Sequence, residues 1–266
     1  MLTIDLSGRR AIVTGASSGI GQAVALALAQ AGADVAGCGI EAAESDGARR
    51  FLANAAEQGR RAAYQTVDVA DAAAARGFAK WAAAQLGGID FVISNAGRNR
   101  FAGAERTDET LWNDNVNLNL AAHWRVAQAA KPYLDQAEQP VVIIMTSNQA
   151  YRTLAGNFPY HVAKAALLGL VQSLALEWGP HIRAVGVAPG FIDTAMNEQY
   201  FATFADPAGE RASVVAKHPV GRLGRPEEVG ALCAFLCSPM AGFISAHGRE
   251  KPAKCGGTMF GSRKSV

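Results

Sequence analysis

The sequence predicts an α/β protein in which a parallel sheet is flanked by helices on both faces. Two observations carry this prediction. Short apolar runs alternate with longer alanine-rich stretches of helical period, and no internal repeat, low-complexity linker or shift of composition interrupts them. The chain has 266 residues, half of them hydrophobic, which is enough for one large core. We therefore expect a single domain over residues 1–266.

The expected elements follow from this alternation in chain order. Buried parallel strands read as continuous apolar runs, and these occur at residues 10–14, 34–38, 62–67, 89–94, 141–146 and 182–187. Helical periodicity occurs at residues 19–31, 43–58, 72–86, 111–133, 158–178 and 227–237. Residues 198–219 hold aromatic and small residues without a clear period. We expect this segment to be a mobile insertion that serves as a lid beyond the carboxyl end of a strand.

Composition excludes several classes of function. The net charge of +2 gives no reason to expect a nucleic acid or an acidic membrane as partner. The first residues lack the basic and apolar regions of a signal peptide, and no run of eighteen uncharged apolar residues could span a membrane. The cysteines are scattered (Cys38, Cys233, Cys237 and Cys255). We expect reduced thiols in the cytoplasm and no metal site.

A glycine-rich loop joins the first expected strand to the first expected helix, and it reads TGASSGIG over residues 14–21. Gly15 permits a tight turn, Gly19 lets the backbone approach a pyrophosphate, and Gly21 lets helix and strand pack closely. The glycine spacing matches the general dinucleotide fingerprint only approximately, and a plain turn is the alternative. With a strand before it and a helix after it, the loop favours a nucleotide site.

Tyr160 and Lys164 lie four residues apart in the expected helix 158–178, and Ser147 precedes the tyrosine by thirteen residues. The first two therefore share one helix face. An ammonium near a phenol favours the phenolate, so we expect Lys164 to lower the pKa of Tyr160 toward the range of a general acid–base. Ser147 can then hold the oxygen of the group that is oxidised or reduced. The alternative for each residue alone is a surface or capping role.

Together these motifs resemble the short-chain dehydrogenase/reductase family, whose glycine motif is Thr-Gly-x-x-x-Gly-x-Gly. The likeness covers about residues 5–245. It implies a doubly wound, Rossmann-type sheet and hydride transfer between a nicotinamide coenzyme and a small-molecule alcohol or carbonyl substrate. The residues that match the coenzyme-binding positions of the family are Gly15, Ser17, Ser18, Gly19, Ile20, Gly21, Asp68, Val69, Asn95, Ala96, Gly97, Tyr160, Lys164, Pro189, Gly190, Ile192 and Thr194.

The resemblance also implies four catalytic residues. Tyr160 would exchange a proton with the substrate oxygen, Lys164 would lower the phenol's pKa and hold the nicotinamide ribose, and Ser147 would polarise the carbonyl. Asn119 would hold a water that links Lys164 to solvent. Asn113, Asn115 and Asn117 crowd the same expected helix, and spacing to the family's flanking positions selects Asn119, with Asn117 as the runner-up.

The identity of the coenzyme depends on the end of the second strand. NAD users in this family often carry Asp there, whereas NADP users supply Arg there or a basic residue in the glycine loop. This chain has Gly39-Ile40-Glu41 at the strand end and Ser18 in the loop. Glu41 would repel a phosphate on the ribose 2′-oxygen, so we favour NAD without excluding NADP.

The substrate pocket is expected to draw on Arg98-Asn99-Arg100, Asn148-Gln149, Arg152, Phe158 and residues 191–200. Arginines suit carboxylates or several hydroxyls, which favours a sugar, sugar acid or polyol. Residues 37–41 loosely resemble the branch that acts on deoxy-ketogluconates. The alternatives are solvated loop arginines, an NADPH-dependent 3-oxoacyl carrier-protein reductase, and a coenzyme-binding scaffold without turnover.

The end of the chain departs from the family. Five of the ten residues 246–255 are charged or histidine, and Pro252 cannot donate to a strand ladder. We expect a loop or local disorder there in place of a regular last strand. In the family this edge helps to build a tetramer together with the helices at 111–133 and 158–178, and those helices alone can support a dimer. We therefore expect a homo-oligomer, either a dimer or a tetramer.

Overall fold

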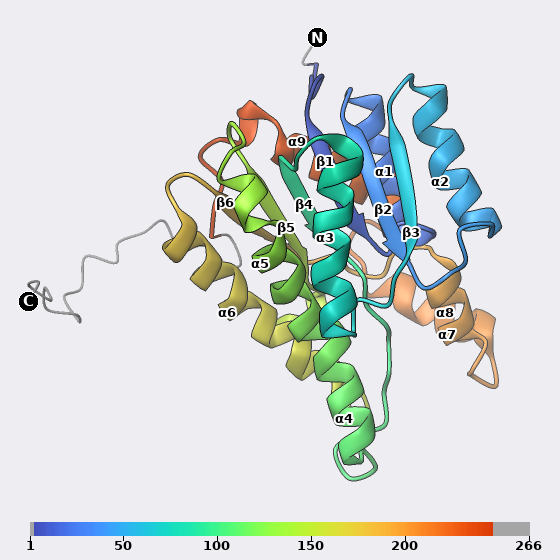
Figure 1. The fold of residues 1–266 in the computed structure, drawn as a ribbon. Helices are drawn as coiled ribbons and strands as arrows, with labels where there is room; N and C mark the ends of the chain where they lie inside the picture. Colours follow the sequence, from blue (N-terminus) through green and yellow to red (C-terminus); the bar gives the residue numbers. More distant parts are fainter. Residues whose placement is uncertain (1–2, 247–266) are drawn as a thin grey trace, which may run out of the picture.

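A computed structural model describes residues 3–246 as one six-stranded parallel sheet with helices on both faces (Figure 1). The strand order is β3-β2-β1-β4-β5-β6, so the order reverses between β1 and β4. The strands are β1 Arg10–Thr14, β2 Asp34–Gly39, β3 Ala62–Thr66, β4 Phe91–Ser94, β5 Val141–Met145 and β6 Arg183–Val187. The predicted doubly wound fold is confirmed, and each expected strand is found within two residues of its predicted bounds.

Helices cover both faces and bury two apolar clusters. One cluster joins α1, α2 and α9 to one face of the sheet, and the other joins α3, α5 and α6 to the opposite face. Successive residues of β1 alternate between them, since Ala11 and Val13 belong to the first cluster and Ile12 to the second. The helices are α1 Gly19–Gln30, α2 Asp46–Glu57, α3 Ala72–Leu86, α4 Glu109–Val116, α5 Ala122–Leu134, α6 Tyr160–Trp178, α7 Ala195–Phe201, α8 Pro207–Ala216 and α9 Pro226–Cys237.

The expected helix 111–133 is interrupted. A π-helical turn, η1 at Asn117–Ala121, separates α4 from α5. Such a turn holds more residues than an α-helical turn and rotates the side chains that follow it. Apolar periodicity continues through the interruption, so the sequence pattern predicts one uninterrupted helix.

Residues 198–219, expected to be a mobile insertion without a clear period, contain helices that the sequence analysis missed. The segment contains the end of α7 and all of α8, which begin at the capping residues Thr194 and Asp206. A small cluster of Phe201, Val214 and Leu223 packs these helices together. Each helix is too short for a readable period. The expected departure at 246–255 lies outside the described residues, apart from Ala246.

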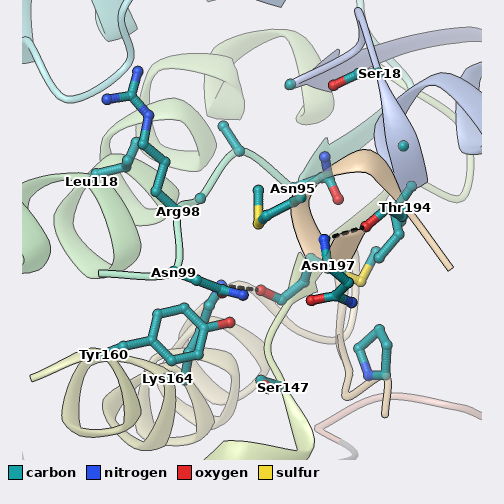
Figure 2. Close-up of a pocket in the computed structure, with 18 of the residues that line it drawn as sticks. Ser18, Asn95, Arg98, Asn99, Leu118, Ser147, Tyr160, Lys164, Thr194 and Asn197 are labelled. Carbon is teal, nitrogen blue, oxygen red and sulfur yellow. Dashed lines mark hydrogen bonds between the residues drawn. The ribbon is translucent and has the colours of Figure 1, made fainter. Parts of the chain in front are cut away.

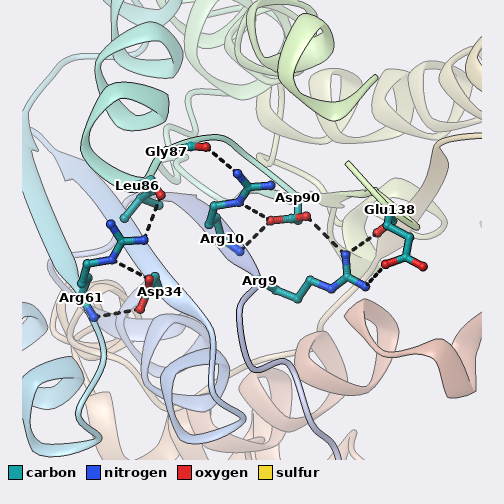
Figure 3. A network of polar contacts seen from close by, with 8 residues as sticks. All are labelled: Arg9, Arg10, Asp34, Arg61, Leu86, Gly87, Asp90 and Glu138. Carbon is teal, nitrogen blue, oxygen red and sulfur yellow. Dashed lines mark hydrogen bonds and ion pairs between the residues drawn. The ribbon is translucent and has the colours of Figure 1, made fainter. Parts of the chain in front are cut away.

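Charged groups tie together the end of the sheet where the strands begin (Figure 3). The buried carboxylate of Asp90, which precedes β4, pairs with Arg10 of β1 at 2.7 Å and with Arg9 at 3.5 Å. It also accepts the backbone N–H of Arg10 at 2.9 Å. Arg61 and Asp34 form a similar pair at 2.8 Å between β3 and β2. Asp90 therefore fixes the two strands that flank the reversal of strand order.

No helix among residues 3–246 is long and apolar enough to cross a membrane.

Replacing Asp90 with Asn keeps the size of the side chain and removes its charge. The two guanidinium groups then lose their shared partner, and we expect the free energy of unfolding to fall by about 2 kcal/mol. The matched control is Asp46→Asn, because Asp46 is exposed and forms its ion pair with the exposed Arg49, and we expect it to leave the stability unchanged. Urea unfolding of the three proteins measures both effects, and equal midpoints for all three would contradict the role assigned to Asp90.

Candidate active site

A cavity of about 320 Å³ lies at the carboxyl ends of the strands, where the strand order reverses. Segments that follow all six strands contribute to its wall, from Gly15 after β1 to Pro189 after β6. Ligand sites in doubly wound sheets form at this reversal, and the volume is within the range of small-molecule pockets. Figure 2 shows Tyr160, Lys164 and Ser147 together on one side of the cavity and Ser18 on the other.

The glycine loop forms a closely fitted backbone cradle. Gly15 and Gly19 adopt positive φ angles of 68° and 52°, which favour glycine. A Cβ atom on Gly21 would overlap the carbonyl of Gly15, so only glycine lets α1 approach β1 here. Ser18 starts α1 without a side-chain capping hydrogen bond. The N–H groups of the first turn are thus available to an anion, as a dinucleotide pyrophosphate requires.

The end of β4 is tied to this loop. The hydroxyl of Thr14 accepts the backbone N–H groups of both Asn95 and Ala96 at 2.9 Å. The side-chain amide of Asn95 donates to the carbonyl of Thr14 at 3.0 Å. These bonds close the wall of the cavity between the glycine loop and the segment that continues to Gly97.

Tyr160, Lys164 and Ser147 come from two neighbouring elements. Tyr160 is the first residue of α6 and Lys164 lies one turn later, while Ser147 follows β5. All three are more than nine-tenths buried. The amine of Lys164 lies 5.7 Å from the centroid of the Tyr160 ring and donates to the carbonyl of Met145 at 2.9 Å. The three residues that the sequence analysis grouped by their spacing therefore lie together at one site.

The pKa values correct one expectation. Burial raises the pKa of Tyr160 to about 12, and a hydrogen bond from Ser147 opposes this rise without cancelling it. Burial also lowers the pKa of Lys164 to about 7. The expected lowering of the tyrosine's pKa by the lysine is thus wrong for this structure, because the amine bonds to Met145 and desolvation dominates at the phenol. Burial disfavours the Tyr160 phenolate and the Lys164 ammonium when either charge forms alone. A phenolate and an ammonium formed together would stabilise each other.

Asn119 lies in the π-helical turn behind Gly97. Its carboxamide makes two bonds to the backbone of Arg98, each of 3.1 Å. A Cβ atom on Gly97 would sit 2.8 Å from the Asn119 Oδ1 atom and 3.5 Å from the Lys164 amine, so this glycine lies against both groups. The runner-up, Asn117, instead accepts a bond from Arg125 at 3.1 Å. The geometry therefore favours Asn119.

Most of the predicted coenzyme-binding residues line the cavity. The three predicted site residues that do not line it are Gly21, Asn119 and Ile192. Ile192 is buried and forms a β-bridge with Gly224. The lining residues that sequence reasoning did not single out include Leu118, Phe101, Leu154 and Asn157. Phe101 reaches the site because its backbone forms a bridge with Pro159, a long-range pairing that no local pattern signals.

The predicted substrate-side residues divide into two groups. Asn99, Asn148 and Gln149 line the cavity. Arg100 instead pairs with Asp114 at 3.3 Å, Phe158 stacks on Trp112, and neither they nor Arg152 line it. Arg98 does line the cavity, but its side chain extends away from Tyr160 and Ser147 (Figure 2). Among residues 3–246, no three His, Cys, Asp or Glu side chains gather to hold a metal ion.

Comparison with known proteins agrees with this geometry. Residues 15–248 match the family profile described as enoyl-(acyl carrier protein) reductase. The chain is 33% identical over 243 residues to the 3-oxoacyl-[acyl-carrier-protein] reductase FabG of Vibrio cholerae, covering 91% of this chain and 95% of that one. The chain belongs to the short-chain dehydrogenase/reductase family. As a member of this family it is an NAD(P)-dependent oxidoreductase.

Two further relatives of this short-chain dehydrogenase/reductase are informative. It is 28% identical over 247 residues to the 2-dehydro-3-deoxy-D-gluconate 5-dehydrogenase of Dickeya dadantii, covering 92% of this chain and 94% of the relative. A short-chain dehydrogenase from Burkholderia cenocepacia, crystallised with NADP, superposes with a TM-score of 0.82 at 34% identity, over 91% of this chain and 95% of that one.

The buried amine gives a prediction about stability and pH. The pKa of Lys164 is about 7 in the folded chain against an ordinary value of 10.5. Between these values the unfolded chain binds the proton more readily, so the stability of the wild-type protein rises with pH across this window. Lys164→Met removes this dependence, and we expect it to be more stable than the wild type by roughly 2 kcal/mol at pH 7. The gain should shrink toward pH 10.

Denaturant unfolding at pH 7, 8.5 and 10 measures this trend. The control is Lys131→Met, because Lys131 is partly exposed and pairs with Asp135 on the helix surface. We expect no pH-dependent gain for the control. A difference between wild type and Lys164→Met that stays constant over this range would show that the amine titrates normally.

Proposed function

We propose that this short-chain dehydrogenase/reductase interconverts a secondary alcohol and a ketone, or an alcohol and an aldehyde, on an uncharged polar substrate such as a sugar or polyol, with NAD as coenzyme. The observation that carries the proposal is the position of Ser147, Tyr160 and Lys164 at one side of a cavity whose other side is the glycine loop.

The residues present fit a nicotinamide dinucleotide. The cradle of Gly15, Gly19 and Gly21 and the uncapped start of α1 would hold the pyrophosphate. Asp68 and Val69 would contact the adenine, Lys164 the nicotinamide ribose, and Pro189, Gly190 and Thr194 the nicotinamide itself. The bound coenzyme supplies or accepts the hydride.

In the proposed mechanism the protein moves one proton and orients one oxygen. In the direction of reduction, the Tyr160 hydroxyl donates its proton to the substrate oxygen, which the Ser147 hydroxyl holds. The phenolate that forms faces the Lys164 ammonium, and the attraction between these charges offsets the cost of burying each one. Asn119 stands behind Gly97 and would hold the water that returns a proton to Lys164. In oxidation the same steps run in reverse.

Glu41 supports the choice of NAD. Its carboxylate accepts a hydrogen bond from Ser17 at 2.5 Å, and both residues line the cavity at the end of β2. A Cβ atom on Gly39 would lie within 2.8 Å of Ser17 Oγ, Glu41 Oε2 and the Tyr64 hydroxyl oxygen. Glycine at this position thus makes room for a carboxylate that can accept from a ribose 2′-hydroxyl and would repel a 2′-phosphate.

The substrate side of the cavity supports an uncharged polar substrate. Carboxamides line it from segments next to the catalytic residues, namely Asn99, Asn148, Gln149 and Asn157. Aromatic and aliphatic side chains complete it, including Phe101, Leu154, Met196 and Tyr200. The charged residues in the whole lining are Glu41 and Asp68 on the coenzyme side, the buried Lys164, and Arg98, which points away from Tyr160. This arrangement favours a sugar or polyol over a sugar acid.

A second candidate is reduction of a 3-oxoacyl carrier-protein thioester. The relative at 33% identity carries this activity in its name, and the apolar part of the pocket suits an acyl chain. Where that reaction uses NADPH, Glu41 argues against this candidate, because its carboxylate would repel the 2′-phosphate of the coenzyme.

We also propose that α7 and α8 act as a lid. Ala195, Met196, Asn197 and Tyr200 of α7 line the cavity. Arg211 of α8 pairs with Glu198 of α7 and with Asp193 ahead of it, so the two helices are held as one unit. This unit is placed to cover the substrate side.

Assembly as a homo-oligomer, a dimer or tetramer, is part of the proposal. Trp124 of α5 and Leu176 of α6 are 43% and 82% exposed, which supports the helices α4, α5 and α6 as the shared surface. Cys38, Cys233 and Cys237 are buried and form no disulfide in the described part of the chain, which is compatible with the expected cytoplasm.

The choice of coenzyme is tested at Glu41. We expect the wild-type protein to prefer NADH to NADPH by at least about tenfold in kcat/KM, and Glu41→Gln to remove most of that preference by abolishing the repulsion. Glu44→Gln is the control, because Glu44 is exposed and outside the cavity lining. A wild-type preference for NADPH, or an unchanged ratio in Glu41→Gln, would contradict this assignment.

The chemistry is tested at Tyr160. With the best substrate from a panel of neutral sugars, polyols, sugar acids and 3-oxoacyl thioesters, we expect Tyr160→Phe to lower kcat by about a thousandfold, since only the proton donor is lost. The dissociation constant of NADH should stay within about twofold, because Lys164 and the loop are intact. Tyr133→Phe, outside the cavity lining, is the control.

Absorbance of the reduced nicotinamide follows every reaction of the panel. Turnover of thioesters alone would replace the first candidate with the second. Turnover by Tyr160→Phe at the wild-type rate would refute the mechanism, and no turnover of any substrate by the wild-type protein would favour a scaffold.

A further inference from the structure

We propose that His123 is a positioning residue that acts through Asn119: its hydrogen bonds to Ser94 fix the π-helical turn that directs Asn119 toward Lys164. This inference rests on the proposed role of Asn119 and extends it to a residue outside the cavity.

His123 occupies the first turn of α5, directly after the π-helical turn. Its side chain is buried, and the residue is 1% exposed. The Nδ1 atom lies 2.8 Å from the hydroxyl oxygen of Ser94 and 3.1 Å from its carbonyl oxygen. Ser94 is the last residue of β4 and precedes the cavity segment Asn95 to Gly97. The contact therefore connects the helix that carries Asn119 to the strand that carries the cavity wall.

The π-helical turn makes this connection necessary. An α-helix advances by about 100° for each residue, so loss of the extra residue in this turn would rotate Asn119 by about that angle relative to α5. Asn119 would then lose its two bonds to the Arg98 backbone and its place against Gly97. π-helical turns are rare, and they occur frequently at functional sites. The contact of His123 with Ser94 is a buried polar contact immediately after the turn.

Sheet register brings this contact close to the lysine. Ser94 is paired with Ile144 of β5, and the next residue, Met145, accepts the hydrogen bond of the Lys164 amine. His123 and Lys164 are thus anchored on adjacent strands, one residue apart in register. Burial of the ring lowers the pKa of His123 well below its ordinary value, and the charge of Lys164 lowers it further. The imidazole is therefore neutral, and its bonding to Ser94 does not change with pH in the working range.

A buried histidine at position 123 carries a free-energy penalty, which argues that this residue has a functional role. Its Nε2 atom is buried without a hydrogen-bond partner in the described part of the chain. Its neighbours on the buried face of α5, such as Ala122, Val126 and Ala127, are apolar. An apolar residue at position 123 would avoid the penalty of the unpaired nitrogen. The contact that offsets this penalty is the hydrogen bond between His123 Nδ1 and Ser94.

The test compares His123→Leu with His123→Asn. Asparagine places a side-chain nitrogen near the position of Nδ1 and keeps a bond to Ser94, whereas leucine cannot. We expect His123→Leu to lower kcat about tenfold, with KM and the dissociation constant of NADH within about twofold. His123→Asn should recover most of the loss. In an Asn119→Ala background, His123→Leu should cause no further loss, because the residue acts through Asn119.

Each other outcome is decisive. Full activity of Asn119→Ala would remove the proposed role of Asn119, and this inference with it. An impaired Asn119→Ala together with a normal His123→Leu would overturn the inference alone, as would losses that multiply in the double variant. If His123→Leu does not fold, His123→Gln takes its place, because the glutamine amide reaches the Nε2 position and misses Ser94. Gln equal to Asn in kcat would also overturn the inference.

Discussion

The burial of one lysine amine at the reversal of strand order is the constraint on which the site depends. Lys164 is 3% exposed, and its amine donates to the carbonyl of Met145. Desolvation lowers its pKa, so the folded chain holds this charge at a cost. Gly97, without a side chain, leaves space beside it. The phenol of Tyr160, one turn away on α6, is buried at the same place and resists ionisation for the same reason. In the proposed mechanism the two charges form together, so that each offsets the cost of burying the other.

The polar groups of the chain are divided between the two ends of the sheet. At one end Asp90, Arg9 and Arg10 hold β1 and the start of β4 in place (Figure 3). At the other end the same strands diverge into the glycine loop and the segment from Asn95 to Gly97, which together bound the cavity. The charge pairs on the first end satisfy each other. At the second end the first turn of α1 has no side-chain cap and the Lys164 amine is buried, so stability is given up there to obtain chemistry.

Local patterns in the sequence, such as apolar runs and helical period, predicted most of the strands and helices. Apolar runs located all six strands, and Ala72–Leu86 was found with its predicted bounds, because it has a strong period between the cap Asp71 and the left-handed Gly87. Spacing brought Tyr160, Lys164 and Ser147 together correctly. The π-helical turn was missed because apolar spacing runs through it, and α7 and α8 because they are too short for a period. The pKa of Tyr160 was misjudged because sequence shows a neighbouring charge but not the desolvation of both groups.

Phe101 has a consequence for how size is discriminated. Its ring meets Tyr160 edge-on at 5.5 Å between centroids and meets Tyr200 of α7 in the same manner at 6.1 Å. Tyr200 of the proposed lid and Tyr160, the proposed proton donor, thus share Phe101 as an aromatic neighbour. On these proposed roles, a molecule large enough to push α7 outward would also withdraw lateral support from the phenol. Bulky compounds would then be rejected mainly through slow catalysis, even when they bind well.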